Sequence, residues 1–475
     1  MAEALWTADE VAAATGGTLA GPSFAANGVS IDTRTVERGD LFVALAGVRD
    51  GHEFVAQALA KGAAGALVSK PVDGPAVMVA DTFTALEQLG AAARQRATKA
   101  RRGAVTGSVG KTSVTQAIMA GLTRAGRAHS SVKSYNNHIG VPLTLARMPR
   151  DTERAVFEIG MNHEGEIRPL TAMVRPHCAV ITNVGPVHVE NFPDGEAGVA
   201  RAKAEIFEGL EPGGVAVLNA DNVWFEALKA QALGAGAQVR TFGRAAGCDA
   251  RLIDFQADAG HAIVQARFHG KGLDFPILQT GAHWGPNAMA VLLMLEALDV
   301  DLDDSLAALG SFEPLAGRGA EKIVQISGGA FTLIDESYNA NPVSMASALA
   351  TLGARKTGTG ETGTAKTGGR RIVALTDMLE LGEQAPGFHA ALAEPIAAAE
   401  VDLVFCAGPL MKSLWDALPP TRRGGYAKTA AELAPQVSRA AEPGDLVMVK
   451  GSNGSKASVI AQALASLDLV SGKAG

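Results

Sequence analysis

The feature that most restricts how this chain can fold is a glycine-rich turn between a short apolar run and a long helical pattern. The apolar run covers residues 104–106, and the helical pattern continues to about Arg124. A strand, a glycine turn and a helix in this order are typical of a parallel sheet that is covered by helices. The turn and the start of the helix consist of Gly107, Ser108, Val109, Gly110, Lys111, Thr112 and Ser113.

This turn has the composition of a phosphate-binding loop. Glycines allow backbone N–H groups to face a phosphate chain, and the N-terminus of the following helix adds positive potential. Lys111 can reach the β- and γ-phosphates of a nucleotide, and the Thr112 hydroxyl can hold magnesium. Val105 stands where the general pattern has its first glycine, so an ordinary glycine turn is the alternative interpretation. The sequence has no Asn-Lys-x-Asp motif for reading guanine, which argues against a guanine-nucleotide switch.

Apolar runs and helical patterns alternate along the rest of the chain and divide it into three units. A length of 475 residues also predicts about three domains, at roughly 150 residues each. We predict a small α/β substrate domain at 1–88, a central P-loop ATPase domain with a parallel sheet at 89–314, and a C-terminal Rossmann-like domain at 315–475. A charged helical pattern at 91–102 leads into the second unit. The alternating region 250–278 predicts one or two antiparallel strands.

One segment of the third unit differs in composition from the rest. Residues 354–369 are rich in glycine, threonine and lysine and contain almost no apolar side chain. Such a segment cannot bury a core, so we predict a flexible surface insertion without an assigned function.

Charge and cysteine content exclude several classes of protein. The formal net charge of −7 gives no basic surface for nucleic acid. Cys178, Cys248 and Cys406 stand singly, which favours a reducing compartment and argues against a structural zinc site. The N-terminus lacks a signal pattern, and no apolar stretch is long enough to span a membrane. We therefore expect a cytoplasmic protein without membrane insertion.

Further motifs place polar and charged residues near the ends of predicted strands. The second unit contains YNNHIGVPLTL at 135–145, EIGMNHEGEI at 158–167, ITNVGPVH at 181–188 and AKAEIF at 202–207; the third contains GRG at 317–319 and DESYNANPVSM at 335–345. Together these motifs resemble those of the Mur ligases, and the resemblance covers nearly the whole chain.

The resemblance implies an ATP- and magnesium-dependent ligase that forms amide bonds in cell-wall precursors. In the family, ATP phosphorylates a terminal carboxylate and an amine then displaces phosphate. The third-unit motifs are most similar to the branch whose substrates are UDP-N-acetylmuramoyl-tripeptide and D-alanyl-D-alanine. A carboxylate is a poor electrophile, so positioning and cations should supply most of the catalysis. We expect the chain to act as a monomer.

The resemblance assigns catalytic roles to Lys111, Glu158, His188 and Lys203, and metal-site roles to Thr112, Glu158, His188 and Lys203. Lys203 matches the family lysine that reacts with carbon dioxide to form a carbamate, and burial would help by keeping the amine neutral. Without the resemblance, a strand-end glutamate and a helical lysine are usually solvated, and a loop histidine is usually structural.

The same resemblance assigns nucleotide contacts. Asn287 matches the asparagine that bonds adenine, although it could instead cap the helix that follows. Arg318 would approach the phosphates and Asp335 the ribose hydroxyls. Tyr338 and Asn339 would lie near the nucleotide, although Asn-Ala-Asn-Pro is also a turn sequence. Because these last four residues belong to the third unit, ATP would be bound fully only when that unit closes onto the second.

The remaining assignments concern the substrate. Asp32 and Arg34 resemble the segment that holds the UDP end, and Asn137 would contact the γ-phosphate or the metal. Alternatively, Asp32 and Arg34 are part of an ordinary polar turn, and Asn137 serves only to stabilise a turn. Residues 377–382 (DMLELG) and 450–452 (KGS) match family motifs, the second of them on the acceptor side.

Two rival interpretations remain open. A sister ligase that adds diaminopimelate or lysine would carry an Asn-Pro-Arg motif, which the sequence lacks. A nucleotide-gated binding protein without ligase chemistry would keep Lys111 but would tolerate loss of Glu158, Lys203 and Asp335, and all three are present. The sequence does not indicate whether the third residue of the tripeptide is diaminopimelate or lysine.

Overall fold

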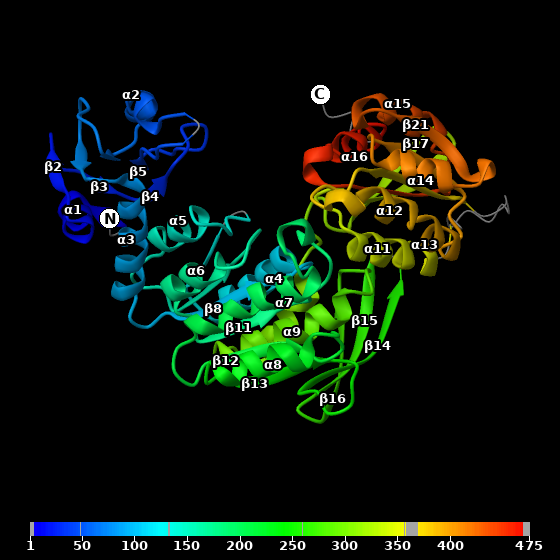
Figure 1. Cartoon of the computed structure of the whole chain (residues 1–475), viewed down its shortest axis with the longest axis horizontal. Helices are drawn as coiled ribbons and strands as arrows, with labels where there is room; N and C mark the ends of the chain where they lie inside the picture. Colours follow the sequence, from blue (N-terminus) through cyan, green and yellow to red (C-terminus); the bar gives the residue numbers. More distant parts are fainter. Residues whose placement is uncertain are drawn as a thin grey trace.

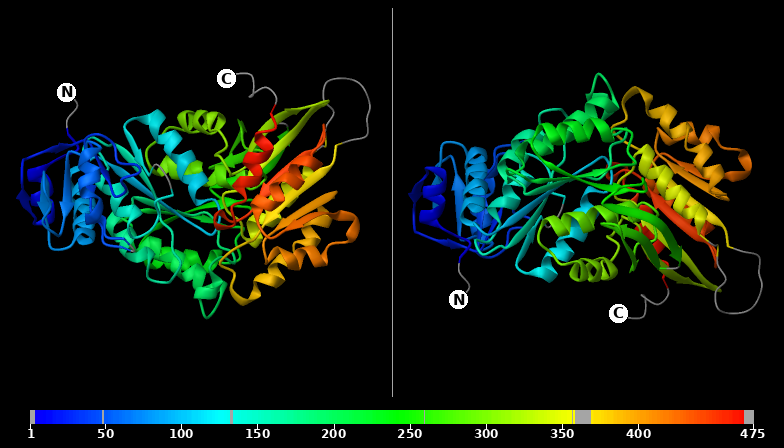
Figure 2. Two further views of the ribbon diagram at one scale, coloured as in Figure 1. Left: turned by 90° about the horizontal axis from the view of Figure 1, so that it is seen from above. Right: turned by 90° about the horizontal axis from the view of Figure 1, so that it is seen from below.

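The chain forms three units, each built on its own sheet, that follow one another along the sequence (Figure 1). The N-terminal and C-terminal units lie at opposite ends of the central unit in both views of Figure 2. This arrangement confirms the predicted three-part α/β fold. The structure is a computed structural model that describes residues 4–47, 49–131, 134–258, 260–355, 357 and 369–468.

The N-terminal unit contains a small sheet of strand order β2-β7-β6-β5-β4 and a separate pair, β1-β3. Helix α1 begins at a capping box, in which the Thr7 hydroxyl accepts from Glu10 N and the Glu10 carboxylate accepts from Thr7 N. The strands are β1 (Trp6–Thr7), β2 (Thr18–Ala20), β3 (Ala25–Ala26), β4 (Gly28–Ser30), β5 (Asp40–Val43), β6 (Gly65–Val68) and β7 (Ala76–Met78), and the helices are η1 (Gly51–Phe54), α1 (Ala8–Thr15), α2 (Val55–Ala60) and α3 (Thr82–Arg96).

Helix α3 connects the first unit to the second. The Asp81 side chain caps it by accepting from Thr84 N. The helix therefore begins well before the predicted segment 91–102 and ends at Arg96, inside that segment. That prediction was wrong because the charged residues mark only the last turn, whereas the cap lies a dozen residues earlier. Helix α3 packs against α5 (Gly140–Ala146), and the predicted boundary at residue 88 lies within α3.

The central unit has one large sheet of order β16-β15-β14-β13-β12-β11-β8-β10-β9. All neighbours from β9 to β14 pair in parallel, and β14, β15 and β16 pair antiparallel. The predicted alternating region therefore supplies three strands rather than one or two. The strands are β8 (Arg101–Thr106), β9 (Ala128–Ser130), β10 (Arg154–Glu158), β11 (Cys178–Ile181), β12 (Val215–Asn219), β13 (Gln238–Gly243), β14 (Ala250–Asp258), β15 (His261–Phe268) and β16 (Lys271–Ile277).

Helices cover both faces of the central sheet, which explains why β8, β10, β11 and β12 are apolar runs. One core contains side chains of α4 and α9, and the other contains side chains of α5 to α8. The helices are α4 (Lys111–Ala125), α6 (Ile167–Val174), η2 (Val189–Asn191), α7 (Glu196–Ala204), η3 (Glu205–Gly209), α8 (Phe225–Gly234), α9 (Trp284–Ala297) and α10 (Leu302–Ser311).

The C-terminal unit is a second sheet with helices on both faces, of order β17-β18-β22-β19-β20-β21. Among the described strands of this unit, β17 pairs antiparallel with β18 and the other neighbours pair in parallel. Its elements are β17 (Ala320–Ile326), β18 (Gly329–Glu336), α11 (Pro342–Ala354), β19 (Arg371–Thr376), η4 (Gly382–Gln384), α12 (Ala385–Ala390), α13 (Ala393–Ala398), β20 (Leu403–Ala407), α14 (Met411–Ala417), η5 (Pro420–Arg422), β21 (Arg423–Ala427), α15 (Ala430–Ala440), β22 (Leu446–Lys450), η6 (Asn453–Ser455) and α16 (Ser458–Ala465).

Two sequence predictions concern features outside this architecture. Most of the segment 354–369, predicted as a flexible insertion, lies outside the described residues. Across the described parts of the chain, every helix is too short or too polar to cross a bilayer.

Candidate active site

The predicted phosphate-binding turn lies at the carboxyl edge of the central sheet. Strand β8 leads into it between β10 and β11, with Glu158 paired beside Val105 and Ile181 beside Thr106. Because these parallel strands end together, Glu158 and the loop after β11 lie next to the turn. Helix α4 starts at Lys111, so its N-terminal N–H groups face the same edge.

The backbone of the turn requires glycine at its first position. Gly107 has a φ of 151°, and a Cβ atom there would lie 1.9 Å from the Thr182 hydroxyl oxygen. Ser108 N donates to the Asn183 carbonyl at 2.8 Å, and the Ser108 hydroxyl donates to the Gly185 carbonyl at 3.0 Å. The turn therefore packs directly on the loop after β11, and a side chain at position 107 would displace it.

Lys111 is folded back onto this turn. Its Nζ donates to the Gly107 carbonyl at 2.7 Å. Burial lowers the pKa of the Lys111 ammonium, whereas the nearby Glu158 carboxylate raises it and Arg318 lowers it. The ammonium thus lies at the phosphate turn, close to one anionic and one cationic group.

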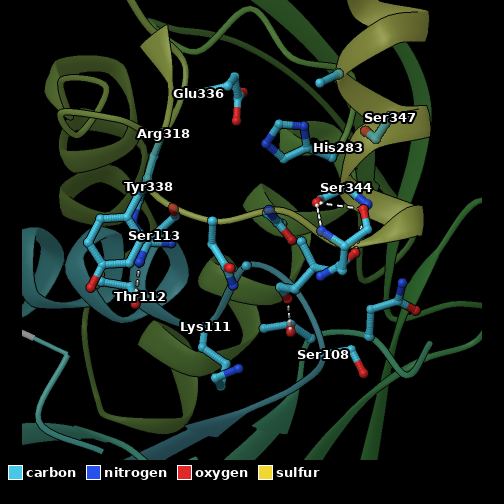
Figure 3. A pocket seen from close by; sticks show the side chains of 18 of the residues that line it. Ser108, Lys111, Thr112, Ser113, His283, Arg318, Glu336, Tyr338, Ser344 and Ser347 are labelled. Carbon is cyan, nitrogen blue, oxygen red and sulfur yellow. Dashed lines mark hydrogen bonds between the residues drawn. The ribbon is translucent and has the colours of Figure 1, made fainter. Parts of the chain in front are cut away.

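A cavity of about 330 Å³ lies over the turn and is lined by both the central and the C-terminal unit. In Figure 3, Arg318 and Tyr338 lie on one side, Ser344 and Ser347 on the other, and Lys111 and Ser108 at the base. The cavity brings together most of the predicted catalytic and nucleotide-binding residues. These are Ser108, Val109, Gly110, Lys111, Thr112, Ser113, Glu158, His188, Asn287, Arg318, Tyr338 and Asn339.

Arg318 joins the two units across this cavity. Its Nη2 donates to the Thr112 hydroxyl at 3.1 Å, and its guanidinium lies 3.9 Å from the centroid of the Tyr338 ring. The ring holds the flat guanidinium in place by stacking. A cation from the C-terminal unit thereby reaches the phosphate turn, as predicted for Arg318.

Asn287 lies in the first turn of α9 and faces the phosphate turn. A Cβ atom on Gly110 would approach its carboxamide to 3.4 Å. The alternative interpretation, that Asn287 caps this helix, is wrong because α9 already begins at Trp284 and Asn287 N donates to the His283 carbonyl. The carboxamide is therefore available at the cavity wall.

The structure places Glu336, rather than Asp335, at the cavity. Successive side chains of a strand point to opposite faces, and Asp335 and Glu336 are the last two residues of β18. The Asp335 carboxylate accepts from Ser337 N instead, at 3.1 Å. Glu336 pairs with Lys450, whose Nζ lies 3.2 Å from its Oε2 and also donates to the Asn339 carbonyl. The predicted contact of Asp335 with the ribose therefore does not fit this arrangement.

The role predicted for Asn137 is likewise displaced by one residue, to Asn136. Its side-chain oxygen accepts from Ile139 N and Gly140 N and caps the turn before α5, so the alternative interpretation describes it correctly. Asn136 takes the place at the cavity. Its Nδ2 donates to Glu158 Oε1 at 2.6 Å, and the Ser134 hydroxyl donates to the same oxygen at 2.8 Å.

This difference gives a direct test in a pair of neighbouring variants. Asn136→Ala removes a hydrogen bond that orients Glu158, so we expect weaker magnesium-dependent ATP turnover with little loss of stability. Asn137→Ala should instead cost about 1 kcal/mol of unfolding free energy, because it removes a helix-end acceptor. Phosphate release and chemical denaturation of both variants measure the two effects. The opposite pattern would show that Asn137 is the active-site residue.

His188 and Lys203 lie within electrostatic reach of Lys111. His188 lines the cavity, and burial together with the charges of Lys111 and Lys203 lowers its pKa to about 4. Lys203, in the last turn of α7, is only 2% exposed and is not on the cavity wall. Burial and then the Lys111 charge lower the pKa of its amine well below the usual value, and within the described residues it forms no hydrogen bond or ion pair.

Asp32 and Arg34 belong to the N-terminal unit and do not line the cavity. They pair with one another, with Arg34 Nη2 at 2.5 Å from Asp32 Oδ2 and the Arg34 side chain largely exposed. The structure therefore does not bring them to the phosphate turn.

The residues over the turn suit magnesium that is bound together with phosphates. No group of three or more histidine, cysteine or acidic side chains within the described ranges could hold a metal by itself. Magnesium commonly takes one or two carboxylates, with substrate phosphates and water completing its octahedron. The Thr112 hydroxyl and the Glu158 carboxylate, whose Oε2 accepts no hydrogen bond from the described residues, supply such a partial donor set.

Sequence reasoning missed several residues of the cavity wall. Ser134, Asn136 and His283 stand next to or within motifs that were identified, but a lone serine or histidine gives no signal of its own. Others come from the N-terminal turn of α11, where a capping box of Asn341 and Ser344 fixes the start of the helix. The residues missed on this wall include Ser134, Asn136, Thr182, Asn183, Asn219, His283, Glu336, Asn341, Ser344 and Ser347. Lys450, which also lines it, belongs to the motif 450–452 that was predicted on the acceptor side.

Comparison with known proteins places this fold and site in one family. Three family models match: the Mur ligase family catalytic domain at 25–99, the Mur ligase middle domain at 105–295 and the Mur ligase glutamate ligase domain at 321–453. The chain belongs to the Mur ligase family, as its motifs predicted.

Among its relatives are enzymes named UDP-N-acetylmuramoyl-tripeptide–D-alanyl-D-alanine ligase. The Bacillus subtilis enzyme is 34% identical over 95% of this chain and 96% of its own. The Escherichia coli enzyme is 35% identical over 82% of this chain and 83% of its own. The crystal structure of MurF from Acinetobacter baumannii is similar as well, with a TM-score of 0.82 and 29% identity over 97% of this chain and 99% of that one.

Proposed function

We infer that this chain joins D-alanyl-D-alanine to UDP-N-acetylmuramoyl-tripeptide, using ATP and magnesium. Relatives of nearly the same length carry this activity in their names. The observation that carries the inference is the cavity in which Lys111, Glu158 and Arg318 meet from two units. A nucleotide-gated binding protein could also use a cation from a separate domain, so the named ligases that match over most of this chain are what favour the ligase.

The phosphate turn and its cations would hold ATP for transfer of its γ-phosphoryl group. Backbone N–H groups at the start of α4 and the Lys111 ammonium would bind the β- and γ-phosphates. Thr112 and Glu158 would hold magnesium, which when bound neutralises charge on those phosphates. Arg318 would absorb more of this charge. The transfer would leave an acyl phosphate on the tripeptide, and the amine of the dipeptide would then displace phosphate from it.

Lys203 is proposed to work as a carbamate. A neutral amine attacks carbon dioxide, a new N–C bond forms, and one proton leaves to give Lys–NH–COO⁻. The burial of Lys203, its lowered pKa and the lack of a partner within the described residues all favour the neutral amine that this step needs. The resulting anion would lie close to the Lys111 and His188 side chains.

The contacts with adenine, ribose and the dipeptide are assigned from where residues lie at the two cavities. Asn287 would read the adenine edge, and Glu336, which replaces Asp335 at the cavity, would accept from the ribose. A second cavity of about 230 Å³ adjoins the first at Lys111 and His188 and is lined by residues 379–381 and 452–454. We assign the dipeptide to this second cavity.

The N-terminal unit would hold the UDP end of the substrate through the segment of Asp32 and Arg34. One chain contributes all the groups named above, so we propose that it acts as a monomer. We also propose that it works in the cytoplasm, because its free cysteines suit a reducing compartment.

The test is phosphate release from ATP with purified chain and UDP-N-acetylmuramoyl-tripeptide. We expect phosphate release with D-alanyl-D-alanine and none with a single amino acid as acceptor. Tripeptides that end in diaminopimelate or in lysine should be compared in parallel. Turnover with diaminopimelate or lysine on the UDP-linked dipeptide would instead identify the sister ligase, and no turnover in any combination would contradict the proposal.

A further inference from the structure

One contact between the central and C-terminal units involves Glu380, a residue to which no role has been given. His188, in the loop after β11, lies with Nδ1 at 3.0 Å from Oε2 of Glu380, in the loop after β19. His188 lines both the first and the second cavity, and Glu380 lines the second. The pair therefore spans the interface of the two units beside the phosphate turn.

Both partners have an unusual backbone conformation. His188 has a φ of 55° and Glu380 a φ of 63°, in the left-handed region that side chains other than glycine rarely adopt. Such conformations cost free energy and persist where the surroundings fix them, commonly at functional sites. Here they turn one side chain from each unit toward the other.

Hydrogen bonds within each unit hold the two loops in place. On the C-terminal side, Leu379 N donates to the Ser452 hydroxyl at 3.1 Å. On the central side, the Ser108 hydroxyl of the phosphate turn exchanges hydrogen bonds with the backbone of Gly185, three residues before His188. Each loop is thus anchored in its own unit before the two meet.

The two loops also fit closely where they meet. Gly382 follows Glu380 by two residues, and a Cβ atom there would approach the Glu190 Cβ atom to 3.0 Å. The contact between His188 and Glu380 is therefore part of a fitted interface between η2 and η4.

The geometry determines which nitrogen of His188 can bind a ligand. The Glu380 carboxylate, 3.0 Å from Nδ1, is anionic, so it electrostatically favours the tautomer that carries the imidazole proton on that nitrogen. The lone pair of Nε2 is then free for a metal or for a hydrogen-bond donor. Carboxylates that hold the far nitrogen of a metal-binding histidine fix the ring and increase its basicity.

We propose that Glu380 is a positioning residue for the metal site: it orients His188 from the C-terminal unit, so the site is complete only when the two units are in contact. This proposal rests on the proposed ligase function and on the metal-site role that the resemblance to the Mur ligases assigns to His188. The Glu380 side chain is 63% exposed, so the pair itself adds little to folding stability and variants at this position should fold.

The test measures metal binding directly. Mn²⁺ is titrated into the full chain saturated with ADP, and free Mn²⁺ is followed by electron paramagnetic resonance with ADP alone as the blank. We expect Glu380→Ala to weaken Mn²⁺ binding about 10- to 100-fold, as other losses of a carboxylate behind a metal-binding histidine do. Glu380→Gln keeps an oxygen that can accept from Nδ1–H, so it should retain most of the affinity.

The matched control is Glu383→Gln, which removes an equal charge from the exposed side of η4 three residues away. It should bind Mn²⁺ as the wild type does. His188→Ala should weaken binding as well, and adding Glu380→Ala to it should cause no further loss. Equal Mn²⁺ affinity in Glu380→Ala and Glu383→Gln, or an undiminished Glu380 effect in the absence of His188, would overturn the proposal.

Failure of the proposed function gives a different result. A wild-type chain that binds Mn²⁺ with ADP but does not join D-alanyl-D-alanine to the tripeptide contradicts the ligase activity alone. The comparison of Mn²⁺ affinities among the variants remains interpretable in that case.

Discussion

Replacing Lys203 with alanine is expected to reduce ligation to near background, a fall of about 10³-fold in turnover. This magnitude is typical when one group that stabilises transition-state charge is lost. Lys203 is fully buried and, within the described residues, has no hydrogen-bond or ion-pair partner. A buried amine without a partner does not stabilise the fold, so we expect the loss of Lys203 to affect activity rather than folding. The fold itself should tolerate the change.

Three measurements together check this prediction. Phosphate release gives the loss of turnover, and added formate or bicarbonate should restore part of it by supplying a small anion in the vacated space. A carbon-13 carbamate signal should be present in the wild type under labelled carbon dioxide and absent in the variant. The control is Lys99→Ala, which removes an exposed lysine that does not line the cavity. Full activity of Lys203→Ala would rule out the role.

The second large effect is expected for Lys111. Lys111→Ala should lower phosphoryl transfer by about 10³-fold, because the variant loses the cation that lies at the base of the cavity. Its Nζ already lies 2.7 Å from the Gly107 carbonyl, so the wild-type side chain needs little reorganisation to reach the β- and γ-phosphates.

Two assays separate chemistry from binding in this variant. Calorimetry with ADP and magnesium should show weaker but measurable binding, since the backbone N–H groups of the turn remain. Single-turnover phosphate transfer should show the much larger loss. Phosphoryl transfer within twofold of the wild type would mean that Lys111 is a structural lysine of the turn and not a phosphate ligand.

The parts of the molecule that could be predicted are those set by local sequence. The strand, turn and helix from β8 to α4 depend on neighbouring residues, and their positions agree with the expected ones. The doubly wound third unit was predictable for the same reason, because buried parallel strands are short apolar runs. Helix α3 was misplaced because its cap, Asp81, gives a weaker signal than the arginines at its end.

The errors in the site have a different cause. Asp335 and Asn137 were each assigned a role that the structure favours for a neighbour, Glu336 and Asn136. A motif identifies a stretch of residues, but which of two adjacent side chains faces a cavity depends on the pleat of the strand and on the turn that follows. Similarly, nothing local to Glu380 predicts His188 as its partner, since that contact exists only between folded units.

The backbone of the phosphate turn limits how this protein can change under selection. Gly107 has no room for a β-carbon, and several of the groups that would bind the nucleotide there, beside the Lys111 and Thr112 side chains, are main-chain amides. An inhibitor held chiefly by those amides would contact atoms that every amino acid shares. A substitution within the turn that weakened binding of the inhibitor would distort the turn itself. Resistance to the inhibitor would therefore have to arise from substitutions at more distant positions or from higher expression of the protein.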